Sequence, residues 1–294
     1  MQRKIAPLAM AALALAFLAS SASAYENANG VGYFALQVPD PAAITVDGLG
    51  GDWGWFDPDF IVGTDQMANT LGNPMPPLND IDIAIHIGWT PEPDNRLYAF
   101  VRVVDDTLNV DETNMDNGWN DDNLELILDP DHAGGWHEEA GALRTGHQQW
   151  TFSVSAPGGY PQIAWLRFQQ PPEMQWAINE GLVEAAVDVQ PELATIVPDV
   201  TVGYEVRMAA FDPYMPDGLD ASTRHIFAAN QTIGLSVVLD EADAVGRTDQ
   251  LATHIQEGGA HDSDYTSEFT LLAIGDYVTA VEGSSWGAVK ALLH

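Results

Sequence analysis

The stretch Trp119-Asn120-Asp121-Asp122-Asn123-Leu124-Glu125-Leu126-Ile127-Leu128-Asp129 indicates the fold most clearly. Its three leucines alternate with other residues, as in a β-strand that turns one face toward a core. The alternation predicts that Glu125 lies on the opposite face, in solvent. In a fully extended chain Trp119 would lie about 20 Å from Glu125, so residues 118–122 must bend if the two side chains are to meet.

The same alternation recurs on both sides of this stretch. Residues 81–89 place four isoleucines and Trp89 on one face, and they are predicted to form a half-buried antiparallel strand. Further strands are predicted at 44–48, 97–104, 150–154, 163–168, 182–189, 204–209, 233–239 and 270–274. Many short strands between turn residues, with few helical signals, predict an all-β fold. We expect an antiparallel β-sandwich of two sheets, with immunoglobulin-like or jelly-roll-like architecture and long loops.

The N-terminus has the pattern of an export signal. Arg3 and Lys4 precede an apolar run over residues 5–18, and Ala22-Ser23-Ala24 provides small residues for cleavage. Residues 1–24 are therefore predicted to be a signal peptide, 25–280 a single β-sandwich domain and 281–294 a C-terminal tail. The mature protein is expected to be secreted, to a periplasm or outside the cell. No segment is long and uncharged enough to predict membrane insertion.

The chain is strongly acidic and contains no cysteine. It has 43 Asp and Glu against 10 Lys and Arg, a net charge of −33. Nucleic acid is not an expected partner, because binding it requires clustered basic residues. Without cysteine there is no disulfide framework. The acidity is typical of a protein that stays soluble in a saline medium, and it is also compatible with calcium binding.

An ordered set of motifs resembles family 9 carbohydrate-binding modules. The set is Ile44-Thr45-Val46-Asp47-Gly48 with Trp53, the paired strands 81–89 and 97–104, Trp119-x-x-Asp122-x-x-Glu125, Tyr204-Glu205-Val206-Arg207, and 233–237 leading to Asp240 and Asp243. The resemblance covers most of the mature chain. Members of this family are β-sandwiches that accompany polysaccharide-degrading enzymes and hold a sugar between two tryptophans. The resemblance therefore implies a secreted, non-catalytic protein that binds a poly- or oligosaccharide.

The resemblance also implies which residues contact the sugar. Trp119 and Glu125 match the family's contact positions, and Gln149 matches a third on a following strand. An aromatic ring can stack on the C–H face of a sugar, while carboxylate and amide groups bind its hydroxyls. If their strands are neighbours, Glu125 and Gln149 share one polar surface. The chain departs from the family at Thr151, where an arginine is usual, and in residues 253–267, which contain no tryptophan.

Acidic residues at the ends of predicted strands make calcium the expected cofactor. Asp47, Asp105 and Asp240 are the predicted ligands, because calcium takes several oxygen ligands from converging loops. Asp52, Asp106 and Asp243 occupy similar positions. The resemblance implies that such ions are mainly structural.

Other functions remain open from the sequence alone. A pair of carboxylates is enough for glycoside hydrolysis, and this chain has many acids. Related sandwiches carry haem in periplasmic oxidoreductase subunits, for which Met208 would be the candidate ligand. A third alternative is a calcium-dependent matrix or surface protein. His132, His137 and His147 lack the spacing of a His-Glu-x-x-His zinc motif, so zinc is not favoured.

Overall fold

The computed structural model describes residues 27–28, 30, 32–112, 115–137, 146–154, 164–166, 175–191, 196–243, 246–259 and 261–277. The predicted signal peptide, 1–24, and the predicted tail, 281–294, lie outside the described residues. So do residues 163, 167 and 168 of the strand predicted at 163–168. Within the described part of the chain, no helix is long and apolar enough to cross a membrane.

The regular secondary structure of the described chain is almost entirely β-strand. The strands are β1 (Tyr33–Gln37), β2 (Val62–Gly63), β3 (Ala68–Asn69), β4 (Ile81–Trp89), β5 (Leu97–Asn109), β6 (Asn123–Asp129), β7 (Gln148–Ser153), β8 (Ala164–Leu166), β9 (Val183–Gln190), β10 (Ile196–Met208), β11 (Thr232–Glu241), β12 (Asp249–Ala252) and β13 (Glu268–Leu272). The short helices are α1 (Trp176–Asn179), η1 (Pro41–Ala43), η2 (Pro58–Phe60), η3 (Thr64–Gln66), η4 (Met115–Asn120), η6 (Leu219–Ala221) and η7 (Ser263–Tyr265).

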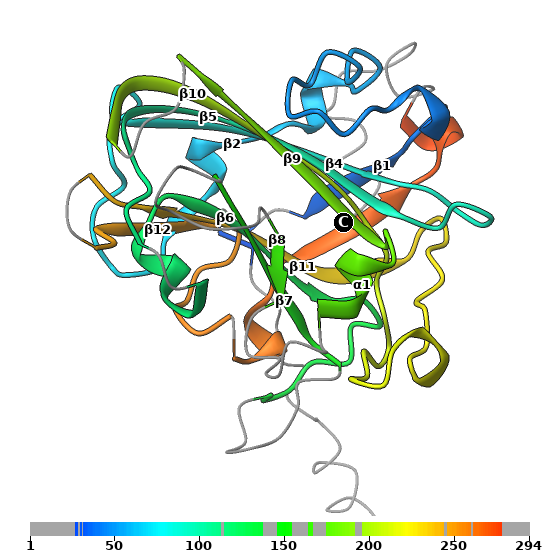
Figure 1. Ribbon diagram of the computed structural model, residues 1–294. Coiled ribbons are helices and arrows are strands. Elements are labelled where there is room, and N and C mark those ends of the chain that lie inside the picture. The colour runs from blue at the N-terminus through cyan, green and yellow to red at the C-terminus, as the bar shows by residue number, and fades with distance from the viewer. Residues whose placement is uncertain are drawn as a thin grey trace, which may run out of the picture.

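Ten of the strands form one hydrogen-bonded path that folds into two layers (Figure 1), and β2, β3 and β12 pair beside it. The path runs β8-β7-β6-β11-β13-β1-β4-β5-β10-β9. One layer contains β4, β5, β10 and β9, and the other contains β11, β6, β7 and β8. The pairing is mostly antiparallel, as expected, but β1 runs parallel to both β13 and β4. The sheet is therefore mixed, and β1 and β13 connect the two layers.

The main core lies between the layers and follows the predicted alternation. In β4 the isoleucines and Trp89 are buried, and in β6 the three leucines face the same core. Val237 and Leu239 of β11 complete this side of the core. Complete burial of each such side chain contributes roughly 1.5–3 kcal/mol, so the alternating pattern strongly fixes the register.

The predicted strand at 44–48 is not a strand. Its backbone donors bind a side chain instead: the N–H groups of Asp47 and Gly48 both donate to Oε2 of Glu205, at 3.0 Å each. The indole N–H of Trp53 donates to Oε1 of the same carboxylate at 2.7 Å. Glu205 lies on the outer face of β10, so this segment covers the outside of the sheet. It packs there in a second, smaller aromatic cluster with Phe100.

Candidate binding pocket and acidic cluster

A cavity of about 600 Å³ lies over the outer face of β6, β7 and β11. Its walls include the side chains Trp119, Glu125, Trp136, Gln149, Arg247 and Tyr265. The structure thus brings the three predicted sugar-contact residues to one cavity. We call this cavity the pocket.

The floor of the pocket is a carboxylate and amide pair from adjacent strands. Gln149 Nε2 donates to Glu125 Oε2 at 2.7 Å, and Thr151 Oγ1 donates to Glu125 Oε1 at 3.2 Å. The strands are neighbours, which is the condition for the shared surface: Glu125 of β6 stands opposite Thr151 of β7. The prediction that Glu125 lies in solvent is wrong: it is only 2% exposed. The cause is that residues of the segments around 247–265 cover the outer face of this layer.

Trp119 reaches the pocket because the chain bends before β6. It belongs to the 3-10 helix η4, and its side chain is 38% exposed. The side chain of Asn123 fixes the bend, since its Nδ2 donates to the carbonyls of Gly118 at 2.6 Å and Asp121 at 3.0 Å. These bonds close the loop that carries the indole onto the first residue of β6.

Arg247 connects the indole to β11. Its guanidinium carbon lies 5.1 Å from the centroid of the Trp119 ring, a cation–π geometry. Its Nη1 also pairs with Oδ1 of Asp240 at 2.9 Å, and Gln250 Nε2 donates to that oxygen at 2.9 Å. Burial, followed by the charge of Glu125, raises the pKa of Asp240 to about 7. Asp240, a predicted calcium ligand, is therefore an ion-pair partner on the pocket side of β11.

A second exposed tryptophan, which was not predicted from the sequence, lines the pocket. Trp136 is 59% exposed and follows β6, in a region that reads only as an irregular Gly-rich loop. A β-bridge to Asp262 and a ring contact with His261, at 6.2 Å between centroids, place it beside the segment that lacks a tryptophan. The second indole thus comes from a different loop, and no local sequence signal pointed to it.

Two neighbouring histidines contact Ser263, in the segment that lines the pocket beside Trp136. His137 Nε2 and His147 Nδ1 lie 2.7 Å and 2.8 Å from the hydroxyl of Ser263, and the two imidazoles stack at 4.8 Å. His132 lies elsewhere, 3.4 Å from Glu268. Among the described residues, neither of the two groups with metal-ligand geometry contains a histidine.

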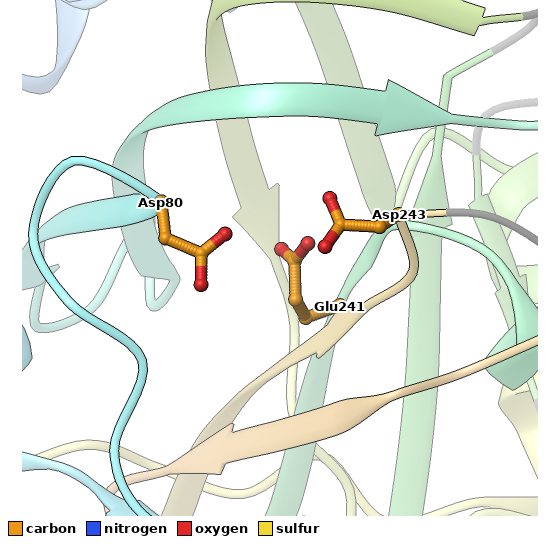
Figure 2. A group of neighbouring side chains, drawn as sticks. All are labelled: Asp80, Glu241 and Asp243. Carbon is orange, nitrogen blue, oxygen red and sulfur yellow. The ribbon is translucent and has the colours of Figure 1, made fainter.

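An acidic cluster closes one end of the core between the layers. It consists of two overlapping groups, Asp80–Glu241–Asp243 and Asp105–Asp122–Glu241, within each of which the carboxylate oxygens lie within 4.8 Å of one another. Figure 2 shows the carboxylate of Glu241 pointing between those of Asp80 and Asp243. Glu241 belongs to both groups because it extends the core-facing side of β11.

Burial makes this cluster electrostatically costly in the absence of a cation. Glu241 is 2% exposed, and neither of its carboxylate oxygens has a hydrogen-bond partner among the described residues. Burial, followed by the charges of Asp122 and Asp105, raises the pKa of Glu241 to about 11. Burial likewise raises the pKa of Asp105 to about 6 and that of Asp122 well above its usual range. A set made only of carboxylate oxygens fits a hard divalent cation such as calcium.

The predicted calcium ligands are mostly not in this cluster. Asp105 belongs to it, but Asp240 pairs with Arg247, and the carboxylate of Asp47 accepts from the N–H of Leu49 at 2.8 Å. Asp80, Asp122 and Glu241 were not among the predicted ligands. Each of them lies at or next to the end of a strand, and this position was the only feature of the sequence that could have identified them. Many other acidic residues share that position.

The fold is that of family 9 carbohydrate-binding modules (CBM9). The sequence matches no family model and no curated protein. A CBM9 from Caldicellulosiruptor kristjanssonii in complex with cellotriose has a TM-score of 0.52 and 13% identity, covering 83% of this chain and 94% of that one. A CBM9 from the same organism in complex with glucose has a TM-score of 0.50 and 13% identity, covering 82% and 95%. At this identity the likeness concerns the fold.

Proposed function

We propose that this protein is an exported, non-catalytic carbohydrate-binding protein that holds a saccharide in the pocket. The observation that carries the proposal is one cavity that joins two exposed indoles, Trp119 and Trp136, to the buried pair of Glu125 and Gln149. Isolated exposed tryptophans are unremarkable, but two of them above a buried polar floor form a surface with both kinds of contact that a sugar needs.

Each part of the pocket suits one part of a sugar. The indoles offer flat apolar faces to the C–H groups of a pyranose ring. Glu125 is an acceptor for hydroxyls, and a hydrogen bond to a charged group contributes roughly 1.5–3 kcal/mol. Gln149 Oε1 is buried and has no hydrogen-bond partner among the described residues, so it provides a further acceptor. Ligand hydroxyls would satisfy these buried oxygens.

The fold and the N-terminal sequence support the proposal. The two similar structures hold cellotriose and glucose, so this architecture can bind neutral glucose-based sugars. The basic and apolar residues before position 25 support export. We further propose that calcium binds the acidic cluster, through Asp80, Asp105, Asp122, Glu241 and Asp243.

The alternative functions have less support. Met208, the candidate haem ligand, is completely buried in the main core, where it fills space between the layers. A calcium-dependent matrix protein remains an alternative, because the acidic cluster is compatible with it. That alternative predicts calcium-dependent assembly and no response to sugars.

Isothermal titration calorimetry with cellotriose and glucose, in the presence of calcium, tests the proposal. Trp119→Ala and Trp136→Ala should each weaken binding about 10-fold or more, which corresponds to about 1.4 kcal/mol of lost stacking. Trp55→Ala is the matched control, because Trp55 packs in the aromatic cluster on the outside of the other layer and should leave affinity unchanged. Absence of binding across a panel of neutral oligosaccharides would overturn the proposal, and so would equal affinity of all three variants.

A further inference from the structure

The acidic cluster and the pocket share two chain segments, although they lie on opposite faces of the same layer. We propose that a divalent cation in the cluster fixes the position of Trp119 and thereby raises the affinity of the pocket for saccharide. The inference rests on the proposed function and adds a regulator to the same site. It follows from the cluster itself and from two connections between the cluster and the indole.

The cluster requires a positive partner, and no residue in the described part of the chain provides one. Among the described residues, the ion pairs of arginine go to Glu184 and Asp240, and none reaches the cluster. Both oxygens of Glu241 are buried without a hydrogen-bond partner in the described structure, and they point into the group (Figure 2). Burying a carboxylate with no partner is strongly unfavourable, so these oxygens indicate a bound cation.

The first connection runs through the start of β6. Asp122 contributes to the cluster, and its carboxylate also accepts from the backbone N–H groups of Asn109 and Ala242, the latter at 2.7 Å. The next residue, Asn123, holds the carbonyl of Gly118, directly before Trp119. A displacement of Asp122 would therefore move the bend that carries the indole.

The second connection runs through the end of β11. Glu241 points to the cluster and the preceding residue, Asp240, points to the pocket, because successive side chains of a strand alternate between faces. Asp240 holds Arg247, whose guanidinium lies over the ring of Trp119. A shift of this strand end would move Arg247 as well.

Removal of the cation therefore has a defined consequence. Repulsion among the carboxylates that remain ionised would separate the ends of β5, β6 and β11, which the cation holds together. Both connections would then loosen Trp119, while the core between the layers remains packed. Saccharide would then bind only when the indole of Trp119 returns to its position in the pocket. The free energy of this rearrangement would lower the measured affinity.

The test measures cellotriose binding by calorimetry with the full mature chain in calcium, after chelation, and after calcium is restored. Chelation should weaken binding about 10-fold, within the usual range of coupling between sites, and calcium should restore it. Glu241→Gln should have weak affinity even in calcium. Glu92→Gln makes the same chemical change at an exposed residue beyond the opposite end of β4 from Asp80, and should behave as wild type.

Two further measurements separate the possible failures. Calcium binding by equilibrium dialysis and acrylamide quenching of tryptophan fluorescence both work without saccharide. In one possible result no saccharide binds, but calcium reduces acrylamide quenching of tryptophan in wild type and not in Glu241→Gln. The proposed function then fails, while the link from the cluster to the indole stands. Saccharide affinity that is equal with calcium, with chelator and in Glu241→Gln would overturn the inference, as would failure to bind calcium.

Loss of folding is distinguished by circular dichroism on the same samples. The chelated protein should keep its β-sheet spectrum at the assay temperature, because the main core does not depend on the cluster. Cooperative unfolding on chelation would overturn the local mechanism. If Glu241→Gln does not fold, Asp243→Asn replaces it, since Asp243 lies at the exposed edge of the cluster and its loss should weaken both calcium and saccharide binding.

Discussion

His254 should make the protein less stable in mild acid. Its contribution to the free energy of unfolding can be measured separately by comparison with a variant that lacks the imidazole. Its ring is buried below the pocket, and its Nδ1 has no hydrogen-bond partner among the described residues. Burial lowers the pKa of His254 from 6.5 to about 4, although a hydrogen bond with the backbone of Gln256 opposes the shift. The folded protein therefore favours the neutral form of the imidazole.

The sign and size follow from proton linkage. In the unfolded chain the ring takes up a proton near pH 6.5, whereas in the folded protein it does so only near pH 4, so the unfolded state binds more protons between these values. Stability is unaffected above pH 6.5 and falls as the pH decreases toward 4. The pKa difference of roughly 2.5 corresponds to a loss of about 3 kcal/mol at 1.36 kcal/mol per pKa unit.

The assay compares urea unfolding of wild type and His254→Gln from pH 7 to pH 4, at constant calcium. Acidic groups titrate in both proteins, so their contributions cancel in the difference between the two free energies of unfolding. The variant should lose less stability on acidification, by about 3 kcal/mol over the whole interval. Parallel curves for the two proteins would refute the reasoning, because they would mean that the ring titrates alike in the folded and unfolded states.

Two further predictions concern the segment that covers the outside of the sheet. Glu205→Gln should destabilise the protein by about 3 kcal/mol in urea unfolding, because an amide cannot accept from both backbone donors and the indole at once. Glu184→Gln, which removes a partly exposed pair with Arg207, should cost about 1 kcal/mol or less, and equal costs would contradict this account. Gly203→Ala should cost about 3 kcal/mol or prevent folding, because its Cβ would lie 2.0 Å from the carbonyl oxygen of Gly48. Gly51→Ala, which meets no atom within 4 Å, should fold normally, and similar thermal midpoints for the two variants would exclude the steric explanation.

Much of the fold could be predicted where side chains alternate regularly. The bounds of β4 agree with the prediction because isoleucine occupies every second position. The first half of β10 was missed because Pro198 and Asp199 read as a turn, and Asp199 has a positive φ of 50°. Pairing with β5 continues past them nevertheless, with Pro198 opposite Thr107. Tertiary pairing outweighs local preference in this strand.

The composition of the two sites was only partly accessible from sequence. Period-two spacing predicted that Glu125 and Gln149 share a surface, since that depends only on strand geometry and on one neighbour relation. The burial of Glu125, the arrival of Trp136 and the grouping of Glu241 with other acids depend on which distant segments meet. Among 43 acids, no local pattern distinguishes those that converge.

The parallel pairing of β1 with β13 sets a condition on when this protein can fold. Tyr33, near the beginning of the described chain, stands opposite Phe269, near its end, and these two strands join the layers. Because a chain is synthesised from its N-terminus, this pair cannot join the two layers until β13 has been made. Until β13 arrives, the edge of β1 that it covers is unpaired and in need of protection.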